Sequence, residues 1–438
     1  MSTKLVTVEL SNPLPDKVEG AEKYDSVWAI VMREDVPLGV VGIDNGHVPV
    51  SQEFLRNEII RQMNWKLTGG KDFRDRAEFE KALGLRQSAI PPEFVKEPEL
   101  SELLPDLKPI SGQTHFLSIV ICTYDRPEDL RRCLQNLVKL EAGRHRFELI
   151  VVDNHPASDK IERLVKEFEG VRYEPEPRPG VSYARNKGLR AAKGDIVAYI
   201  DDDVVVPSGW LRRILAPFSD ERVMCVSGLV LPLELETDSQ EMFEKYGGLG
   251  RGYAPRVFGE EFFNTKHSVQ SWTLGGTANV AIRKSVIRQS GMFDETLGPG
   301  YPTGVGEDIY MFYRILKFGH LCYYEPAAYV WHKHRNSMKA LRKQLYSYHK
   351  GQVSYQLRCL VSDGDMRVLR QLFYDLPWWY AKRIYRILRG REKYPMGLVL
   401  IEMAGLAMGA SAFIKSNRIH RELNGAGTNP IRPELVDI

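Results

Sequence analysis

Three successive aspartates follow an apolar run near the middle of the chain. The segment Ile196 to Asp203 reads IVAYIDDD, so a β-forming stretch stops at Asp201, Asp202 and Asp203. These carboxylates cannot all be buried and ionised without a partner, because desolvating an unpaired charge is costly. Hard oxygen ligands suit Mg²⁺ or Mn²⁺, which keep positions open for water and a diphosphate. The cluster indicates a metal site, with an exposed acidic turn or a helix cap as the alternative.

Polar residues also follow two earlier apolar runs. The run FLSIVIC leads into Thr123, Tyr124, Asp125 and Arg126, and the run FELIVVD ends at Asp153. In an open α/β sheet, ligands bind at the carboxyl ends of the strands. We therefore expect these residues to lie beside the three aspartates if the sheet is parallel.

The elements that must position these residues alternate between strands and helices from Phe116 onward. Helical segments are predicted from Pro127 to Val138, from Lys160 to Phe168 and from Ser182 to Ala192. This pattern predicts the α/β class with a mainly parallel central sheet. No GxGxxG follows the first strand and no Walker A sequence occurs, which counts against a dinucleotide dehydrogenase and a P-loop NTPase.

Length and composition bound the other possibilities. The chain has 438 residues, enough for two or three domains, and its 60 basic and 57 acidic residues give no general case for nucleic-acid binding. Five dispersed cysteines without a CxxC pair argue against a disulfide framework or a structural zinc site. The N-terminus lacks the pattern of a signal peptide, so a cytoplasmic protein is expected.

The changes of pattern along the chain predict four regions. Residues 1–88 are expected to form a small N-terminal α+β accessory domain, and residues 89–113, rich in Pro and acids, a linker. Residues 114–336 carry the strand and helix alternation, and residues 337–438 are predicted to be a helical region.

Seven motifs between residues 116 and 335 resemble one enzyme family. Within residues 116–335 the ordered motifs are TYDRPEDLRRCL, VVDN, RPGVSYARNKGL, IDDDVVVPSGWL, GGTANVAIRK, GEDIYMFYRI and VWHKHR. In this order they are similar to the family 2 glycosyltransferases, whose fold is named GT-A. The resemblance implies the GT-A fold and a nucleoside-diphosphate sugar as donor.

The resemblance also implies a set of nucleotide-sugar contacts. In that family the end of the first strand and the aspartate after the second strand hold the nucleobase, while a basic helix start meets the phosphates. The matching residues here are Thr123, Tyr124, Asp125, Arg126, Asp153, Arg185, Asn186, Asp201 and Asp202. Capping of strand ends and a solvated helix surface are the alternative explanations.

A metal site is implied by the same family pattern. Asp201 and Asp203 match its DxD motif, with Asp201 near the ribose and Asp203 bound to Mn²⁺ or Mg²⁺. Asp202 occupies the variable middle position. His332 matches a residue that often completes the coordination, although a lone histidine is often structural and His334 competes for the role.

The acidic pair Glu307-Asp308 resembles the family's catalytic pair, with Asp308 at the position of the general base. A sugar hydroxyl is a poor nucleophile at neutral pH, so a carboxylate must take its proton as it attacks the anomeric carbon. A single in-line displacement inverts the configuration at that carbon. The alternative is that both acids only favour the dipole at a helix start.

Small and aromatic residues indicate where sugars approach the backbone. Gly275 and Gly276 resemble the family segment at which donor sugar and acceptor meet, and Trp272 is a candidate for stacking on a sugar ring or for packing in the core. Residues Tyr246 to Phe258 are glycine-rich, basic and aromatic, and are interpreted as an acceptor-side loop.

The C-terminal region has the composition of a membrane-surface helix. Leu376 to Lys393 mixes Trp and Tyr with six Lys and Arg, and Met396 to Ile414 is mostly apolar. Glu402 and the many small residues weaken a membrane span. We expect peripheral attachment to the inner face of a membrane, with a packed helical hairpin as the alternative.

The leading hypothesis is an inverting, metal-dependent hexosyltransferase of family 2 that moves a sugar from a nucleoside-diphosphate sugar to an acceptor hydroxyl. A UDP-sugar is the leading candidate for the donor. The acceptor would be a glycan, a lipid-linked carrier or a small molecule in cell-envelope or polysaccharide synthesis. The QxxRW motif of processive synthases is absent, which favours single-sugar addition. A silent nucleotide-sugar or glycan-binding module and a nucleotidyltransferase are the alternatives.

Overall fold

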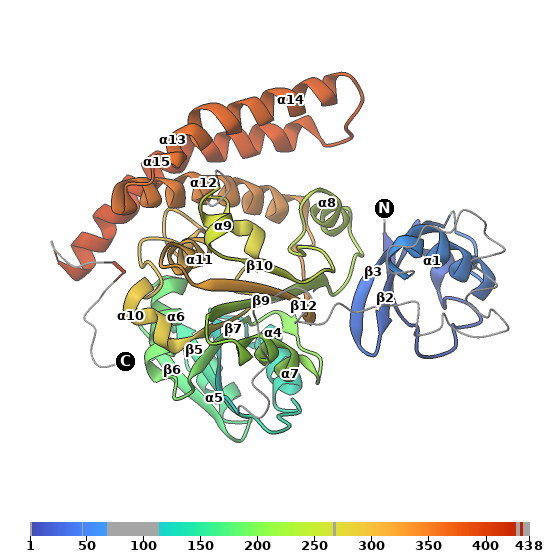
Figure 1. Ribbon diagram of the computed structural model, residues 1–438, viewed down its shortest axis with the longest axis horizontal. Coiled ribbons are helices and arrows are strands. Elements are labelled where there is room, and N and C mark those ends of the chain that lie inside the picture. The colour runs from blue at the N-terminus through green and yellow to red at the C-terminus, as the bar shows by residue number, and fades with distance from the viewer. Residues whose placement is uncertain (1, 46, 68–113, 266–268, 426–429, 432–438) are drawn as a thin grey trace.

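The computed structural model describes residues 2–45, 47–67, 114–265, 269–425 and 430–431 (Figure 1). The predicted linker, residues 89–113, lies outside the described residues, as does the end of the predicted N-terminal region from residue 68. In the view of Figure 1 the N-terminal sheet lies beside the central sheet, and the C-terminal helices lie across one side of that sheet.

The N-terminal part forms a three-stranded sheet with one helix. The elements are β1 (Thr3–Glu9), β2 (Ser26–Arg33), β3 (Val36–Asp44) and α1 (Gln52–Leu67). Strand β2 is parallel to β1 and antiparallel to β3. The two residues between β2 and β3, Glu34 and Asp35, have φ of 50° and 60°, which suits a tight hairpin turn.

The second sheet holds the polar strand ends. Its strand order is β10-β12-β9-β11-β7-β4-β5-β6, and β8 pairs with β12. The bounds are β4 (Phe116–Thr123), β5 (Arg146–Asn154), β6 (Val171–Glu176), β7 (Ile196–Asp201), β8 (Val204–Val205), β9 (Val223–Pro232), β10 (Arg256–Phe258), β11 (Asn279–Arg283) and β12 (Leu321–His332). The predicted α/β class with a central sheet is confirmed.

The parallel arrangement holds for β7, β4, β5 and β6, whereas β11 runs antiparallel to both of its neighbours. The register pairs Asn279, at the start of β11, with Ile200, near the end of β7. Because β11 runs in the opposite direction, the residues that precede it lie at the same sheet edge as the ends of β4, β5 and β7. The sheet is therefore mixed, and its antiparallel strand contributes to the ligand edge.

Helices cover both faces of this sheet. They are α4 (Pro127–Leu137), α5 (Lys160–Val165), α6 (Val181–Ala191), α7 (Trp210–Leu215), α8 (Asp238–Tyr246), α9 (Glu260–Phe263), α10 (Ile287–Ser290) and α11 (Glu307–Lys317). Short 3₁₀ turns occur at Ala21–Lys23, Ala216–Ser219, Ser271–Leu274 and Lys284–Val286.

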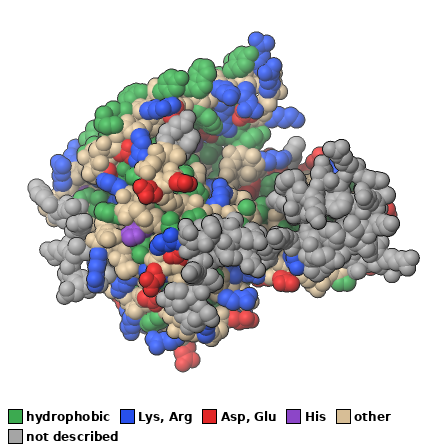
Figure 2. Space-filling model, in the orientation of Figure 1, with side chains coloured by type: hydrophobic (Ala, Val, Ile, Leu, Met, Phe, Trp, Pro, Cys, Tyr) green, Lys and Arg blue, Asp and Glu red, His purple; other side chains and the backbone are tan. Residues whose placement is uncertain are grey.

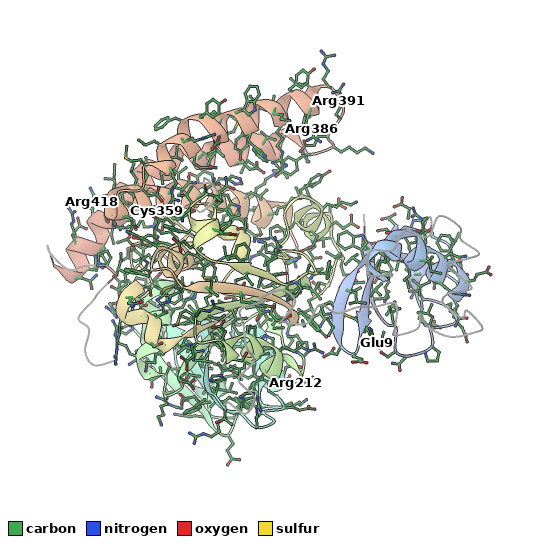
Figure 3. The ribbon with its side chains drawn as sticks, in the orientation of Figure 1. Glu9, Arg212, Cys359, Arg386, Arg391 and Arg418 are labelled. Carbon is green, nitrogen blue, oxygen red and sulfur yellow. The ribbon has the colours of Figure 1, made fainter. Side chains whose placement is uncertain are left out.

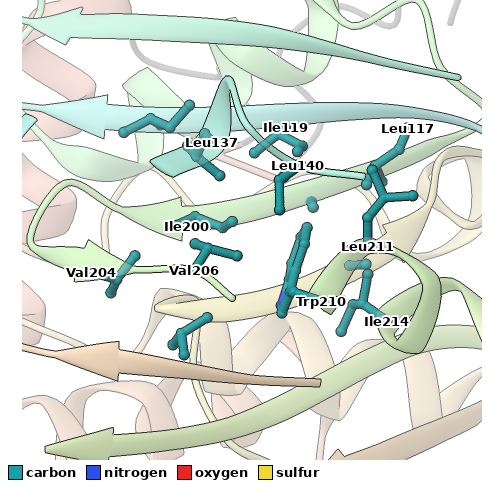
Figure 4. Close-up of a cluster of buried hydrophobic side chains, with 14 of the residues drawn as sticks. Leu117, Ile119, Leu137, Leu140, Ile200, Val204, Val206, Trp210, Leu211 and Ile214 are labelled. Carbon is teal, nitrogen blue, oxygen red and sulfur yellow. The ribbon is translucent and has the colours of Figure 1, made fainter. Parts of the chain in front are cut away.

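Alternating strand residues divide the core between the two faces. Ile119 packs with Trp210 and Leu211 of α7 (Figure 4), whereas Val120 packs with Ala184 of α6 and Met311 of α11. Both faces of the sheet are therefore buried, which explains why its strands read as continuous apolar runs.

The C-terminal region is helical, as predicted. It contains α12 (Met338–Asp363), α13 (Arg367–Arg370), a π-helical turn (Gln371–Asp375), α14 (Leu376–Leu388) and α15 (Met396–Asn424). Helix α12 lies against the segment before α11, where a Cβ on Gly351 would be 2.7 Å from the carbonyl oxygen of Val305. On its other side α12 packs along α15 (Figure 1).

Strand β2 connects the N-terminal sheet to the central sheet. Its residues alternate, so that Ala29 and Val31 face the small N-terminal core while Ile30 and Met32 join the core that contains Leu229 of β9. The hydroxyl of Tyr329 also donates to Asp35 Oδ1 at 2.6 Å. The two sheets therefore share a buried apolar interface.

Candidate metal and nucleotide-sugar site

The parallel strands bring the predicted residues to one edge. The register sets Thr123 at the end of β4 opposite Asp153 at the end of β5, and Cys122 opposite Asp201 at the end of β7. The first two polar strand ends and the aspartate cluster therefore lie beside one another, as the sequence analysis expects for a parallel sheet.

Asp202 is turned toward the protein. Its carboxylate is buried and accepts hydrogen bonds from Thr123 Oγ1 at 2.7 Å and from Arg126 Nη1 at 3.1 Å. Burial, followed by the charge of Asp203, raises the pKa of Asp202 to about 7. Arg126 also donates to Asp203 Oδ2 at 3.0 Å, so Arg126 offsets part of the negative charge of the cluster.

The other two aspartates face His332. Strand β8 pairs with the end of β12, with Val204 opposite His332, and this pairing carries the histidine to the cluster. One potential ligand atom from each of Asp201, Asp203 and His332 lies within 4.8 Å of the others. His332 Nε2 is 3.2 Å from Asp203 Oδ1.

The electrostatics of this trio suit a divalent cation. Burial, and then the charge of Asp203, raises the pKa of Asp201. Burial opposes ionisation of Asp203 as well, but the hydrogen bond and charge of His332 hold the pKa of Asp203 below its usual range. Two carboxylate oxygens and one imidazole nitrogen form a donor set that Mn²⁺ or Mg²⁺ accepts.

A second pair of residues lies behind His332. The Nδ1 atom of His332 is 3.2 Å from Nδ1 of His334, and Nε2 of His334 is 2.6 Å from Oε1 of Glu244. His334, the competing candidate, thus occupies a position behind His332 in which it orients that ring. Sequence reasoning missed Glu244, because α8 lies about 90 residues earlier in the chain and only the fold makes it a neighbour.

The two acids at the start of α11 have different surroundings. Glu307 is buried and accepts a short hydrogen bond from Arg185 Nη1. Burial, followed by the charge of Asp308, raises the pKa of Glu307. Arg185 Nη2 also lies 3.9 Å from Asp201 Oδ1, so this buried guanidinium connects the acidic helix start to the aspartate cluster.

Asp308 is only partly buried and lies at the glycine segment. Its Oδ2 accepts from the backbone N–H of Thr277 at 3.3 Å. A Cβ on Gly276 would lie 3.2 Å from the same oxygen, and Gly275 has φ of 123°. The carboxylate of Asp308 therefore lies against the backbone of Gly276, just before β11, where no side chain separates them.

The aromatic candidate of this segment packs inside the protein. The ring of Trp272 meets that of Tyr355 edge to face at 6.4 Å, and its carbonyl oxygen accepts from Arg251 Nε at 2.9 Å. Arg251 belongs to the predicted acceptor-side loop, Tyr246 to Phe258, and also donates to the carbonyl oxygen of Gly250. Trp272 thus holds this loop against the core.

The nucleotide-contact candidates are not all at the site. Asp153 is buried and accepts from the hydroxyl of Tyr173 at 3.0 Å, and Tyr124 is 60% exposed. Asp125 has φ of 49°, a left-handed conformation that aspartate tolerates.

Asn186, by contrast, is fully buried. Its side-chain amide accepts from the backbone N–H of Phe293 and donates to the carbonyl oxygen of the same residue, at 3.0 Å each. Its polar atoms hold a loop and do not reach the strand edge.

Together, the fold and the strand edge define an α/β protein with an acidic sheet edge that could hold a divalent cation. Residues 118–287 match the family model described as Glycosyl transferase family 2. The resemblance seen in its motifs is thereby confirmed for this part of the chain.

Several relatives carry glycosyltransferase names. The pre-mycofactocin glycosyltransferase of Mycobacterium tuberculosis H37Rv is 31% identical over 263 residues, which cover 57% of this chain and 51% of the relative. Glycosyltransferase AglE of Haloferax volcanii is 25% identical over 191 residues, covering 42% of this chain and 58% of the relative. The chain thus spans about half the length of these curated relatives.

Among solved structures, the mannosyltransferase PcManGT of Pyrobaculum calidifontis in complex with GDP-Man and Mn²⁺ is similar, with a TM-score of 0.42 and 15% identity over 74% of this chain and 80% of that chain.

Proposed function

We propose that this chain is an inverting, metal-dependent glycosyltransferase that moves one sugar from a nucleoside-diphosphate sugar to an acceptor hydroxyl. A UDP-sugar is the leading candidate for the donor. The observation that carries the proposal is the link from Asp201 through Arg185 to Glu307, which sets the partly buried Asp308 next to the metal-ligand trio. This arrangement supports a site in which the donor diphosphate and the general base are neighbours.

Each side chain has a chemical task in this proposal. Asp308 takes the proton of the acceptor hydroxyl while the oxygen of that hydroxyl attacks the anomeric carbon of the donor sugar. The bond from that carbon to the diphosphate breaks in the same step. Asp201, Asp203 and His332 would hold Mn²⁺ or Mg²⁺, which neutralises charge on the departing diphosphate. Glu307 keeps Arg185 in place, so it supports the site through a buried ion pair.

The donor nucleoside would lie at the ends of β4 and β5. Thr123 and Asp153 are buried and would form the inner wall of the nucleoside site, whereas Tyr124 is exposed and its ring is available to stack on a nucleobase. Arg126 and Arg185 supply positive charge on either side of the aspartates.

The setting follows from the same proposal. We propose synthesis of envelope or extracellular glycans or glycoconjugates on the cytoplasmic side, with a glycan, a lipid-linked carrier or a small molecule as acceptor and with peripheral contact to the inner face of a membrane. A relative named Succinoglycan biosynthesis protein ExoM, from Rhizobium meliloti, supports this setting.

A donor screen tests the proposal. The full chain is incubated with UDP-, GDP- and dTDP-sugars and Mn²⁺, and release of nucleoside diphosphate is measured with and without candidate acceptors. Turnover of one donor that stops on addition of EDTA is the expected result. Binding without turnover would favour a silent binding module, and formation of a nucleotide sugar from a sugar phosphate and a nucleoside triphosphate would favour a nucleotidyltransferase.

A further inference from the structure

Helix α15 exposes apolar residues and buries polar ones. One face of the helix is lined by exposed residues that recur every three or four positions: Leu400, Met403, Ala404, Ala407, Met408, Ser411 and Ile414. Ala410 and Lys415 are exposed as well. Leu400 is 60% exposed and Ile414 is 69% exposed. The buried side of the helix combines Leu398, Val399 and Ala412 with polar residues, so apolar side chains lie on both sides of α15.

The buried face of α15 is held by polar contacts. Glu402 accepts hydrogen bonds from the hydroxyls of Tyr380 and Tyr394. Ser416 donates to the carbonyl oxygen of Thr296. These paired polar groups fix the rotation of α15, so the apolar residues remain outside.

The preceding segment extends the exposed apolar surface. In the π-helical turn and α14, Phe373 is 77% exposed, Trp378 67% and Leu388 76%. Figure 2 shows hydrophobic side chains along the edge of the molecule where Figure 1 places α14 and α15. We call the exposed apolar residues of the segment 373–414 the C-terminal apolar face.

Positive charge flanks this face. Figure 3 shows Arg386 and Arg391 near one end of the helical pair and Arg418 toward the other end. Between residues 376 and 418 the acids are Glu392, which pairs with Arg383 and Arg386, and the buried Glu402. Arg386 pairs with Glu392 and Arg418 with Glu422, but Lys and Arg outnumber the acids over this segment. An apolar strip with aromatic residues and an excess of basic residues matches an anionic lipid surface.

Helix α15, with 29 residues, is long and apolar enough to cross a membrane by length and composition. Its packing opposes that orientation. A Cβ on Gly405 would be 2.5 Å from the carbonyl oxygen of Tyr346, and one on Gly409 would be 2.4 Å from Val353 Cβ, so α15 lies in close contact with α12. Helix α12 is rich in Lys and Arg and could not follow α15 into hydrocarbon.

We propose that the C-terminal apolar face binds the surface of an anionic bilayer, with α14 and α15 lying in the interface and not crossing it. Trp378, Leu400 and Ile414 enter the boundary between headgroups and acyl chains, and the basic residues at the ends meet lipid phosphates. The inference concerns a surface separate from the strand edge and does not rest on the proposed catalytic function.

Vesicle sedimentation of the full chain tests this proposal without any donor sugar. We expect binding to vesicles of phosphatidylcholine mixed with phosphatidylglycerol, weaker binding to phosphatidylcholine alone, and weaker binding at high salt because the basic ends are screened. The triple variant Leu400→Gln/Met408→Gln/Ile414→Gln should bind more than about tenfold more weakly, because three apolar side chains lose their burial in lipid.

Two further variants serve as controls. Phe373→Ser/Trp378→Ser/Leu388→Ser tests α14 in the same way and provides a second test if the α15 variant fails to fold, which circular dichroism reports. Val138→Gln/Phe318→Gln replaces two exposed apolar residues elsewhere and should leave binding unchanged.

Four results would overturn the proposal. The first two are no vesicle binding by the wild type, and binding by both triple variants that equals that of the wild type. The third is retention on the membrane after an alkaline carbonate wash, and the fourth is a wild-type dimer that binds no lipid and that the α15 variant converts to a monomer. The third would indicate a span, and the fourth an interface between two copies of the chain.

Discussion

Glu307 and Asp308 are neighbours in the chain but not in environment, because successive residues of a helix point about 100° apart. Glu307 is buried against Arg185, whereas Asp308 is partly exposed beside Gly276. The sequence could place the pair at a helix start, but the pairing with Arg185 assigns the inner member to structure.

The first prediction concerns Asp308. Asp308→Asn should lower turnover by about a thousandfold or more, because the amide cannot accept the proton of the acceptor hydroxyl. The affinity for the donor nucleotide, measured by calorimetry, should change less than about twofold, since the nucleotide contacts lie on other strands. Asp159→Asn, an exposed acid on the surface, is the control. Joint loss of nucleotide affinity and turnover would assign Asp308 a structural role.

The second prediction concerns Glu244. Glu244→Gln should weaken Mn²⁺ binding by about tenfold or more, because Glu244 orients His334 and through it the ring of His332. Mn²⁺ titration followed by electron paramagnetic resonance measures the affinity without catalysis. Glu260→Gln, at an exposed position, should bind Mn²⁺ as the wild type does. An unchanged Mn²⁺ affinity in Glu244→Gln would remove the orienting role.

At the scale of the element, the contact between α12 and α15 depends on glycine. Gly405 has no room for a side chain because the backbone of α12 is too close, whereas Gly397, near the start of the same helix, has no atom within 4 Å of an added Cβ. The same substitution at these two positions therefore separates helix propensity from packing.

The third prediction follows from this difference. Gly405→Ala should lower the free energy of unfolding by about 1–3 kcal/mol, because the helices must separate to admit the methyl group. Gly397→Ala should leave it unchanged or raise it by up to about 1 kcal/mol, since alanine favours a helix over glycine. Urea unfolding followed by circular dichroism measures both. Equal effects at the two positions would show that α12 and α15 are not in close contact.

At the scale of the whole molecule, the N-terminal sheet is held by one face of β2. Ile30 faces the core shared with the central sheet, and Val31 faces the separate N-terminal core. Changes at adjacent residues should therefore have different consequences for the arrangement of the two sheets.

The fourth prediction uses this alternation. Ile30→Asp should detach the N-terminal sheet, because a buried, unpaired carboxylate is avoided most easily by opening the interface. Small-angle X-ray scattering should show a larger radius of gyration. Val31→Ala should lower the stability of the N-terminal sheet, by about 0.5–1.5 kcal/mol or more, and keep the compact radius. An unchanged radius in Ile30→Asp would contradict the shared interface.

The sequence alone determined those features that are carried by neighbouring residues. The apolar runs predicted β4, β5 and β7 of the central sheet, and the polar residues after them predicted the ligand edge, because strand ends are local in sequence. The ordered motifs indicated the resemblance to the family 2 glycosyltransferases, which the match over residues 118–287 confirms. The antiparallel direction of β11 was not predicted, since its apolar run has the same pattern in either direction.

Only the tertiary structure decided which polar residues share one place. His332 reaches the aspartates through the pairing of β8 with β12, Glu244 arrives from α8, and Asn186 is held by the backbone of Phe293. The outward rotation of α15 is likewise set by distant partners such as Thr296. Residue types limit the available chemistry, but contacts between distant segments determine burial, charge pairing and orientation, and those assign each side chain its role.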